Sequence, residues 1–177
     1  MERGKVYLIG FMGAGKSTVA PHLAEELGLD WVDTDGLIEE KTDLSIPEIF
    51  EYYGEGRFRE LERETIREIS EGDPKVVAVG GGAPMDDENW ERMKSTGEVV
   101  YLEVSPKEVM ERVGYDGSRP LLADLNLEEK EEKIRRLMKK RHPRYNRADF
   151  ALLCNGAGTV TVAEEIASKL NGKYEDS

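Results

Sequence analysis

The sequence predicts an α/β protein built on a doubly wound parallel sheet. Five short apolar runs, each bounded by turn residues, are separated by stretches of helical periodicity, which is the pattern of βαβ units. The first run, 5–10, is β-branched and aliphatic and ends at a glycine, as expected of a strand buried on both faces. With 177 residues, the chain is predicted to form a single domain, 1–177.

The first half of the chain is expected to contain two strands and four helical stretches. In chain order these are a strand at 5–10, a helix at 16–27, a strand at 29–33, a helical stretch at 36–41, a helix from 45 and a helix at 57–70. Gly28 is a usual C-terminal stop for the first helix. Ser45, followed by Pro47 and Glu48, predicts a capped helix start.

The second half continues the alternation of strands and helices. The expected elements are strands at 75–79, 98–104 and 150–154 and helices from 105, at 127–147 and at 159–170. Acids alternate with Lys and Arg through 127–147, which favours a long solvated helix. The polar segment from 114 to 126 is too irregular for a core element and is placed like a mobile flap. Residues from 171 onward are expected to fray.

Composition excludes several classes of function. The net charge of −12 disfavours binding to nucleic acid or anionic membranes. The apolar runs are far shorter than the roughly 18 to 20 residues that span a bilayer, and the N-terminus does not resemble a signal peptide. We therefore expect a cytoplasmic protein without nucleic-acid or membrane partners. The only cysteine, Cys154, is expected to serve packing.

One motif carries specific chemistry: Gly10-x-x-x-x-Gly15-Lys16-Ser17 is a complete P-loop between a predicted strand and a predicted helix. Its glycines let backbone N–H groups surround phosphate oxygens, and the helix N-terminus adds positive potential. Lys16 is expected to reach the β and γ phosphates, and Ser17 to ligate Mg²⁺. A glycine-rich turn without a ligand is the alternative, which the strand and helix disfavour. The predicted ATP contacts in this loop are Gly13, Ala14, Gly15, Lys16, Ser17 and Thr18.

A P-loop alone does not separate kinases, GTPases and mechanical ATPases. No Asn-Lys-x-Asp motif for guanine occurs, and Asp33-Thr34-Asp35-Gly36 matches only the two fixed positions of Asp-x-x-Gly. The third strand of a mechanical ATPase normally ends in an acid, whereas "VVAVGGG" ends in glycine. A short chain with a flap containing Arg and Pro indicates phosphoryl transfer to a small molecule.

Six short motifs occur in one order along the chain. They are "GFMGAGKST", "DTD" at 33–35, "FRELE" at 58–62, "GGG" at 80–82, "RPLL" at 119–122 and "RHPRY" at 141–145. With them, the sequence resembles the shikimate kinase family over nearly its whole length. That family consists of P-loop small-molecule kinases with a nucleoside monophosphate kinase-like fold.

The resemblance implies an architecture and a reaction. The expected fold is a three-layer, five-stranded parallel sheet in the order 2-3-1-4-5, with a substrate-binding subdomain at about 34–62 and a lid at about 113–126. The expected reaction converts ATP and shikimate into ADP and shikimate 3-phosphate, in the pathway to chorismate and the aromatic amino acids. Mg²⁺ is the implied cofactor, and we expect a monomer.

Two acids receive roles from the family motif. Asp33 is expected to hold Mg²⁺, commonly through water, and Asp35 to bind hydroxyls of shikimate. A carboxylate near a metal orients its hydration shell, and another accepts hydrogen bonds from a diol. Asp35 is also the candidate acceptor of the hydroxyl proton, although a loose transition state needs little help from a base. Capping of the next helix is the alternative role for both acids.

Two arginines are expected to bind the substrate carboxylate. Arg59 lies in the family's Phe-Arg-x-x-Glu motif and Arg141 in its Arg-x-x-x-Tyr motif, and a guanidinium group matches a carboxylate bidentately. Glu62, three residues after Arg59, is placed to orient it. A surface ion pair would be the better interpretation of Arg59 without the motif. Arg144 would replace Arg141 if the helix were rotated.

The remaining predicted contacts come from loops. Gly81 and Gly82 are expected to offer N–H groups to shikimate, a loose turn being the alternative. Arg119 resembles the lid arginine that reaches ATP phosphates on closure, which makes Lys16, Asp35 and Arg119 the expected catalytic residues. Many relatives carry Arg or Gln near adenine in the loop after the last strand, where Asn155 is expected to contribute here.

Two other functions remain open at this stage. One is a different small-metabolite or nucleotide kinase of the same superfamily, which the pair of arginines disfavours because it indicates a carboxylate substrate. The other is a nucleotide-binding regulator that has lost catalysis, which the complete set of motif positions disfavours.

Overall fold

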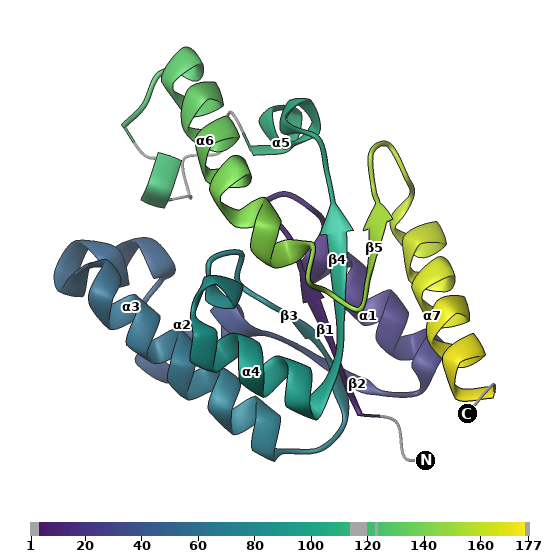
Figure 1. Ribbon diagram of the computed structural model, residues 1–177. Helices are drawn as coiled ribbons and strands as arrows, with labels where there is room; N and C mark the ends of the chain where they lie inside the picture. The colour runs from purple at the N-terminus through teal and green to yellow at the C-terminus, as the bar shows by residue number, and fades with distance from the viewer. Residues whose placement is uncertain (1–3, 114–119, 123, 176–177) are drawn as a thin grey trace.

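A five-stranded parallel sheet forms the centre of the computed structural model, which describes residues 4–113, 120–122 and 124–175 (Figure 1). The strands are β1 (Lys5–Ile9), β2 (Asp30–Asp33), β3 (Lys75–Ala78), β4 (Gly97–Glu103) and β5 (Phe150–Leu153). Their order is β2-β3-β1-β4-β5, and every neighbouring pair is parallel. The predicted fold class and strand order are confirmed.

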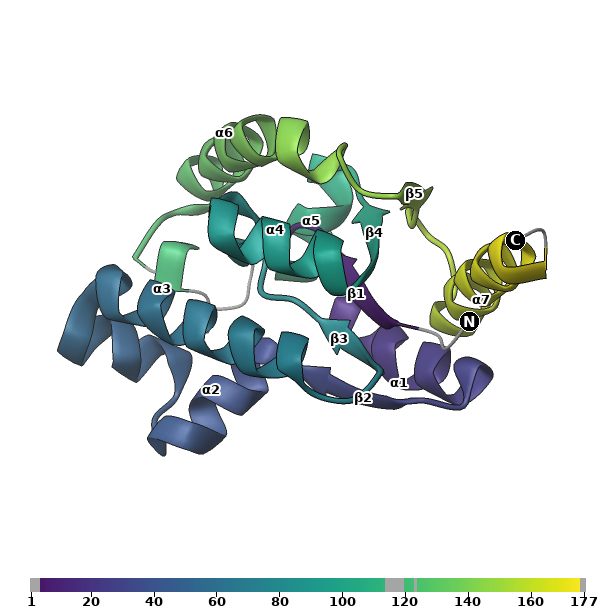
Figure 2. The ribbon, with the colours of Figure 1, turned by 60° about the horizontal axis from the view of Figure 1, so that its bottom comes forward.

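Helices cover both faces of this sheet, so that the described residues form three layers. The helices are α1 (Lys16–Leu27), α2 (Thr34–Thr42), α3 (Ile46–Glu71), α4 (Asp87–Thr96), α5 (Pro106–Val113), α6 (Leu127–Tyr145) and α7 (Thr159–Glu175). Figures 1 and 2 show α1 and α7 together on one face and α3 and α4 on the other. Helices α5 and α6 pack together beyond the carboxyl end of β4 (Figure 1).

Several helix ends follow from the local signals in the sequence. Gly28 ends α1 with φ 65°, and Ser45 and Glu48 form a reciprocal capping box at the start of α3. The two helices predicted between 45 and 70 form one element, α3, which is interrupted at Gly54 with φ 78° and ψ 172°. That conformation is accessible essentially to glycine alone, so it marks the boundary that the sequence suggested.

Two helices differ from the expectation. Helix α4 was not predicted, because only Trp90 and Met93 are large and apolar in its ten residues, although Asp86 caps it by accepting a hydrogen bond from the Asn89 N–H. Helix α7 continues to Glu175 instead of fraying from residue 171, which corrects that prediction. Strand β5 lies at the sheet edge, and Leu153 is 64% exposed.

The core surrounds β1, whose five residues are all buried. Cys154 is also buried, as expected for a packing residue. None of the described helices has the length and apolar character of a membrane span.

Candidate functional site

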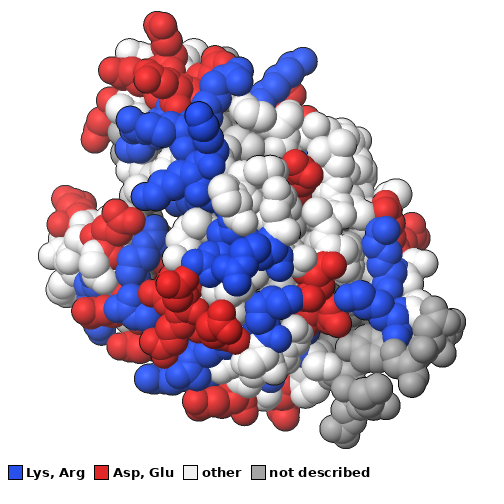
Figure 3. Space-filling view, in the orientation of Figure 1, with Lys and Arg blue, Asp and Glu red and all other residues white. Residues whose placement is uncertain are grey.

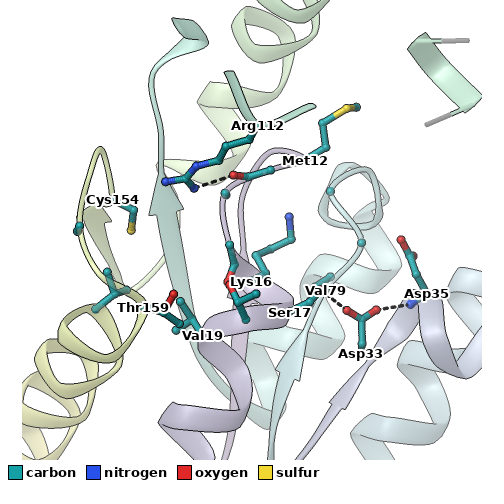
Figure 4. Close-up of a pocket in the computed structure, with 18 residues that line it drawn as sticks. Met12, Lys16, Ser17, Val19, Asp33, Asp35, Val79, Arg112, Cys154 and Thr159 are labelled. Atoms are coloured by element: carbon teal, nitrogen blue, oxygen red, sulfur yellow. Dashed lines mark hydrogen bonds between the residues drawn. The ribbon is translucent and has the colours of Figure 1, made fainter. Parts of the chain in front are cut away.

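A cleft of about 380 Å³ opens at the carboxyl ends of β1, β2 and β3 (Figure 4). The crossover that leaves β1 through α1 and the crossover that leaves its neighbour β3 through α4 lie on opposite faces of the sheet, and such a point is where open α/β sheets bind ligands. The cleft is lined mainly by the loop before α1 and by Asp33, Asp35, Gly80, Gly81, Arg112, Cys154, Ala157 and Thr159. All of the predicted P-loop contacts, Gly13 to Thr18, therefore lie in one cavity.

The P-loop needs its glycines. Gly10, Gly13 and Gly15 have φ values of 150°, 74° and 92°, and a Cβ on Gly13 would stand 2.9 Å from the Val113 side chain. Lys16 follows at the start of α1, and its Nζ donates hydrogen bonds to the carbonyls of Gly10 at 2.7 Å and Phe11 at 2.9 Å. The Lys16 ammonium group and the N-terminus of α1 thus both lie where the glycine loop lines the cleft.

Ser17 and Asp33 meet at the side of the cleft. Ser17 Oγ donates to Asp33 Oδ2, while Asp33 Oδ1 accepts from the N–H groups of Asp35 at 2.9 Å and Gly36 at 3.3 Å. Asp33 therefore caps α2, which was the alternative role considered for it, while its other oxygen faces the P-loop. Its role at Mg²⁺ remains a prediction. A hydroxyl and a carboxylate fit Mg²⁺, which takes oxygen ligands and retains several waters. Elsewhere in the described chain, no group of three or more His, Cys, Asp or Glu side chains gathers for a metal.

A smaller pocket of about 110 Å³ adjoins this cleft. It shares Met12, Asp35, Gly80 and Gly81 with the cleft. Its other lining residues are Ile46, Phe50, Phe58, Arg59, Glu62, Gly82, Pro120, Leu121 and Arg141. The structure thus brings together every residue that the sequence predicted for substrate binding.

The glycine run at 80–82 makes room for charged side chains. A Cβ on Gly82 would stand 2.8 Å from Arg59 Nη2, and one on Gly81 would stand 3.3 Å from Arg141 Nη1. A Cβ on Gly80 would stand 2.8 Å from Asp35 Oδ1. The sequence predicted Gly81 and Gly82 as N–H donors to a ligand. Their lack of side chains also leaves room beside the loop for the guanidinium groups of Arg141 and Arg59.

The predicted contact between Arg59 and Glu62 is present. Arg59 Nη1 donates to Glu62 Oε2, and Arg59 Nη2 donates to Glu55 Oε1 at 2.9 Å. Glu62 is only 1% exposed, whereas Glu55 has an exposed side chain. Burial raises the pKa of the Glu62 carboxyl to about 7, against the opposing effect of the Arg59 charge.

Arg141, rather than Arg144, points to the pocket. Arg141 is 6% exposed and lies with its guanidinium carbon 5.4 Å from the centre of the Phe11 ring. Arg144 instead pairs with Asp87 outside this pocket. Tyr145 Oη donates to the Gly81 carbonyl at 2.6 Å, and burial raises the pKa of Tyr145 to about 12, so its hydroxyl remains a neutral donor.

Arg112 is a cleft residue that the sequence prediction missed. From α5, its Nη1 donates to the Gly13 carbonyl at 2.8 Å (Figure 4). Its Nη2 donates to Glu108 Oε1 at 2.6 Å. The available signal was a cation in the last turn of the helix after β4. Arg112 thus lines the cleft and contacts the P-loop backbone, although α5 is distant from the P-loop in sequence.

Two predicted ATP contacts are not among the residues found at the cleft. Arg119 lies outside the described residues. Asn155 is described, but its Oδ1 accepts a hydrogen bond from the Ser105 N–H at 2.9 Å, and Ala157 and Thr159 line the cleft instead. The role of Asn155 near adenine remains a prediction.

The sheet order and the glycine loop before α1 define an α/β P-loop protein. The family model for shikimate kinase matches residues 12–171. The chain belongs to the shikimate kinase family.

Individual relatives agree over most of their lengths. The shikimate kinase of Thermodesulfovibrio yellowstonii is 41% identical over 170 residues, covering 96% of this chain and 94% of the relative. That of Thermus thermophilus is 41% identical over 166 residues, covering 93% and 89%. The structure of shikimate kinase from Acinetobacter baumannii in complex with shikimate has a TM-score of 0.92 at 38% identity, covering 97% and 94%. Deoxyadenosine kinase from M. mycoides, 16% identical with a TM-score of 0.62, shares the fold alone.

Proposed function

We propose that this chain transfers the γ-phosphoryl group of ATP to the 3-hydroxyl of shikimate, giving ADP and shikimate 3-phosphate. The observation that carries the proposal is the wall of Met12, Asp35, Gly80 and Gly81 shared by the P-loop cleft and the arginine pocket. A phosphoryl donor in the cleft would face an acceptor in the pocket across this wall. Membership of the shikimate kinase family supports the same reaction.

The cleft supplies the donor half of the site. Backbone N–H groups from Gly13 to Thr18 and the Lys16 ammonium would bind the phosphates of ATP. Ser17 and Asp33 would hold Mg²⁺, which when bound neutralises charge on the phosphate oxygens. The Thr18 hydroxyl donates to the Gly15 carbonyl at 2.9 Å and so stabilises the loop that these N–H groups come from.

The pocket supplies the acceptor half. Arg59 and Arg141 would bind the shikimate carboxylate, while Asp35 would accept hydrogen bonds from its hydroxyls and receive the proton released at the 3-hydroxyl. Gly81 and Gly82 would offer N–H groups. Asp35 and Arg59 come from α2 and α3, which supports treating 34–62 as a substrate-binding subdomain, whereas Gly81, Gly82 and Arg141 come from outside this range.

A coupled assay of the purified protein with Mg-ATP and shikimate tests the proposal, with gluconate and AMP as control acceptors. Turnover is expected with shikimate and with neither control acceptor. Turnover only with a control acceptor would refute the shikimate assignment, and ATP binding without turnover of any acceptor would favour a nucleotide-binding regulator.

Two variants test the residues as distinct from the reaction. Asp35→Asn should lower kcat about 10²-fold or more, because the acceptor loses its orienting carboxylate and proton acceptor. Arg59→Ala should mainly raise the KM for shikimate, since half of the carboxylate site is removed. Wild-type kinetics in both variants would refute the site assignment even if the activity is correct.

A further inference from the structure

Glu62 is a buried carboxylate of which only one oxygen accepts a hydrogen bond from a described residue. Its Oε2 accepts a hydrogen bond from Arg59 Nη1, and the residue is 1% exposed. Its Oε1 is also buried and accepts no hydrogen bond from any residue that the structure describes. A buried ionised oxygen without a hydrogen-bond donor is unfavourable, so this oxygen is suited to carry a proton.

The charged groups around Glu62 come from three helices. Asp35 belongs to α2, Arg59 to α3 and Arg141 to α6, which also supplies the neutral hydroxyl of Tyr145. Glu62 Oε1 and Asp35 Oδ1 face the same small space, because they stand 2.9 Å and 2.8 Å from the point that a Cβ on Gly80 would occupy. The glycine loop adds no charged side chain, and Glu55 on the far side of Arg59 faces solvent.

A count of these charges shows what an acceptor would change. With Asp35 and Glu62 ionised, the two carboxylates balance the two guanidinium groups of Arg59 and Arg141. A substrate carboxylate adds a third negative charge and competes with Glu62 for Arg59. In a site that has lost water, such an excess charge raises the pKa of the most deeply buried carboxyl.

We infer that Glu62 takes up a proton when the substrate carboxylate binds, which releases Arg59 from Glu62 to the substrate and restores the charge balance of the pocket. The proton goes from solvent to the carboxyl of Glu62 and leaves again with the product. This inference rests on the proposed function, since it requires a carboxylate acceptor. Glu62 acts through Arg59 and is therefore a positioning residue.

Burial allows the Glu62 carboxyl to take up a proton near neutral pH, because its pKa in the free protein is already raised to about 7. The bound substrate raises this pKa further. The complex therefore holds more protons than the free protein from about pH 7 upward, and the affinity for shikimate falls as the pH rises through this window.

Calorimetric titration with shikimate in two buffers of different ionisation enthalpy measures the proton uptake. At about pH 7.5, the wild type should take up about 0.3 to 0.7 proton per shikimate, and its Kd should rise several-fold between about pH 6 and 8.5. Glu62→Gln, which keeps the shape without the titration, should take up none and bind independently of pH. Glu55→Gln removes the exposed partner of Arg59 and should leave the uptake unchanged.

The outcomes separate this inference from the proposed function. Binding heats that do not depend on the buffer, in a protein that turns shikimate over, overturn the inference alone, as does unchanged proton uptake in Glu62→Gln. Absence of both binding and turnover refutes the proposed function and the inference with it. If Glu62→Gln does not fold, infrared difference spectra of wild-type protein with carbon-13-labelled glutamate decide: a labelled protonated carboxyl band must grow on addition of shikimate, and its absence overturns the inference.

Discussion

The guanidinium group of Arg59 lies against Gly82, where a single methyl group on Gly82 would overlap it. Arg59 reaches the pocket from α3 only because the loop after β3 has no side chain at this position. The backbone of Gly82 has φ −86°, a conformation open to any residue. The need for glycine here comes from the neighbouring guanidinium group rather than from the backbone.

Gly82→Ala should therefore displace Arg59 without altering the P-loop. We expect the KM for shikimate to rise about tenfold or more, with a small change in the KM for ATP, as for loss of a charge-assisted hydrogen bond. Steady-state kinetics with each substrate varied in turn measure this. Gly172→Ala, where a Cβ meets nothing within 4 Å, is the matched control with unchanged kinetics; an equal effect on both KM values would contradict the explanation.

At the scale of single residues, the sequence predicts chemistry better than orientation. The P-loop and the two acids at the end of β2 and the start of α2 follow from motif and spacing, because each lies at a strand end. The choice between Arg141 and Arg144 depended on helix register, which packing against Phe11 and Asp87 decides. Arg112 was missed because its contact with Gly13 joins positions 99 residues apart.

The interruption of α3 at Gly54 is the main irregularity at the scale of elements. It separates the turn that carries Phe50 from the helix that carries Phe58, Arg59 and Glu62. The rings of Phe50 and Phe58 nevertheless pack with their centres 5.0 Å apart. The bend thus places both rings in the lining of the smaller pocket, which also contains Arg59 and Arg141 and is the acceptor pocket of the proposed reaction.

Gly54→Ala should destabilise the protein by about 1–3 kcal/mol, since alanine is strained at φ 78° and ψ 172°. Urea unfolding monitored by circular dichroism measures the change. Gly56→Ala is the matched control two positions further, where the helical backbone has open space at Cβ; it should stabilise the protein by about 0.5–1 kcal/mol. Equal effects of the two substitutions would show that α3 straightens freely at Gly54.

Helix α4 shows why some elements escape prediction from sequence. Its two large apolar residues, Trp90 and Met93, are too few to establish a period. They are buried because α3 and β4 pack against them in the folded chain. Such a helix is specified by tertiary contacts. By contrast, α1 ends at the C-cap Gly28, and α6 begins with a capping box of Asn126 and Glu129, so both have signals in the local sequence.

Charge is distributed unevenly over the whole molecule. The net charge is −12, yet Figure 3 shows Lys and Arg side chains gathered along α6 and toward α4. A groove of about 770 Å³ there contains Arg63, Lys140, Arg144 and Arg147 and shares Arg59 and Arg141 with the acceptor pocket. An anionic acceptor would therefore approach a locally positive surface on a negative protein.

Salt should act in opposite directions on stability and on substrate binding. Raising NaCl from about 0.05 M to about 0.5 M screens the repulsion among the excess acids and should raise the melting temperature. The same change weakens attraction of shikimate to the arginine groove and should raise its KM several-fold. Thermal melting and kinetics across the salt series test this; a KM insensitive to salt would exclude a contribution from the groove.

Asp33, Thr34 and Asp35 are consecutive residues whose side chains serve three different neighbours. Asp33 meets Ser17, the Thr34 hydroxyl accepts a hydrogen bond from the Gly80 N–H at 2.9 Å, and Asp35 lines the acceptor pocket. Only one residue therefore separates the carboxylate that meets the P-loop from the carboxylate that lines the smaller pocket. Because Asp33 and Asp35 are joined this closely, we expect substitutions that reshape the smaller pocket from α3 or α6 to leave the contact between Asp33 and Ser17 in place.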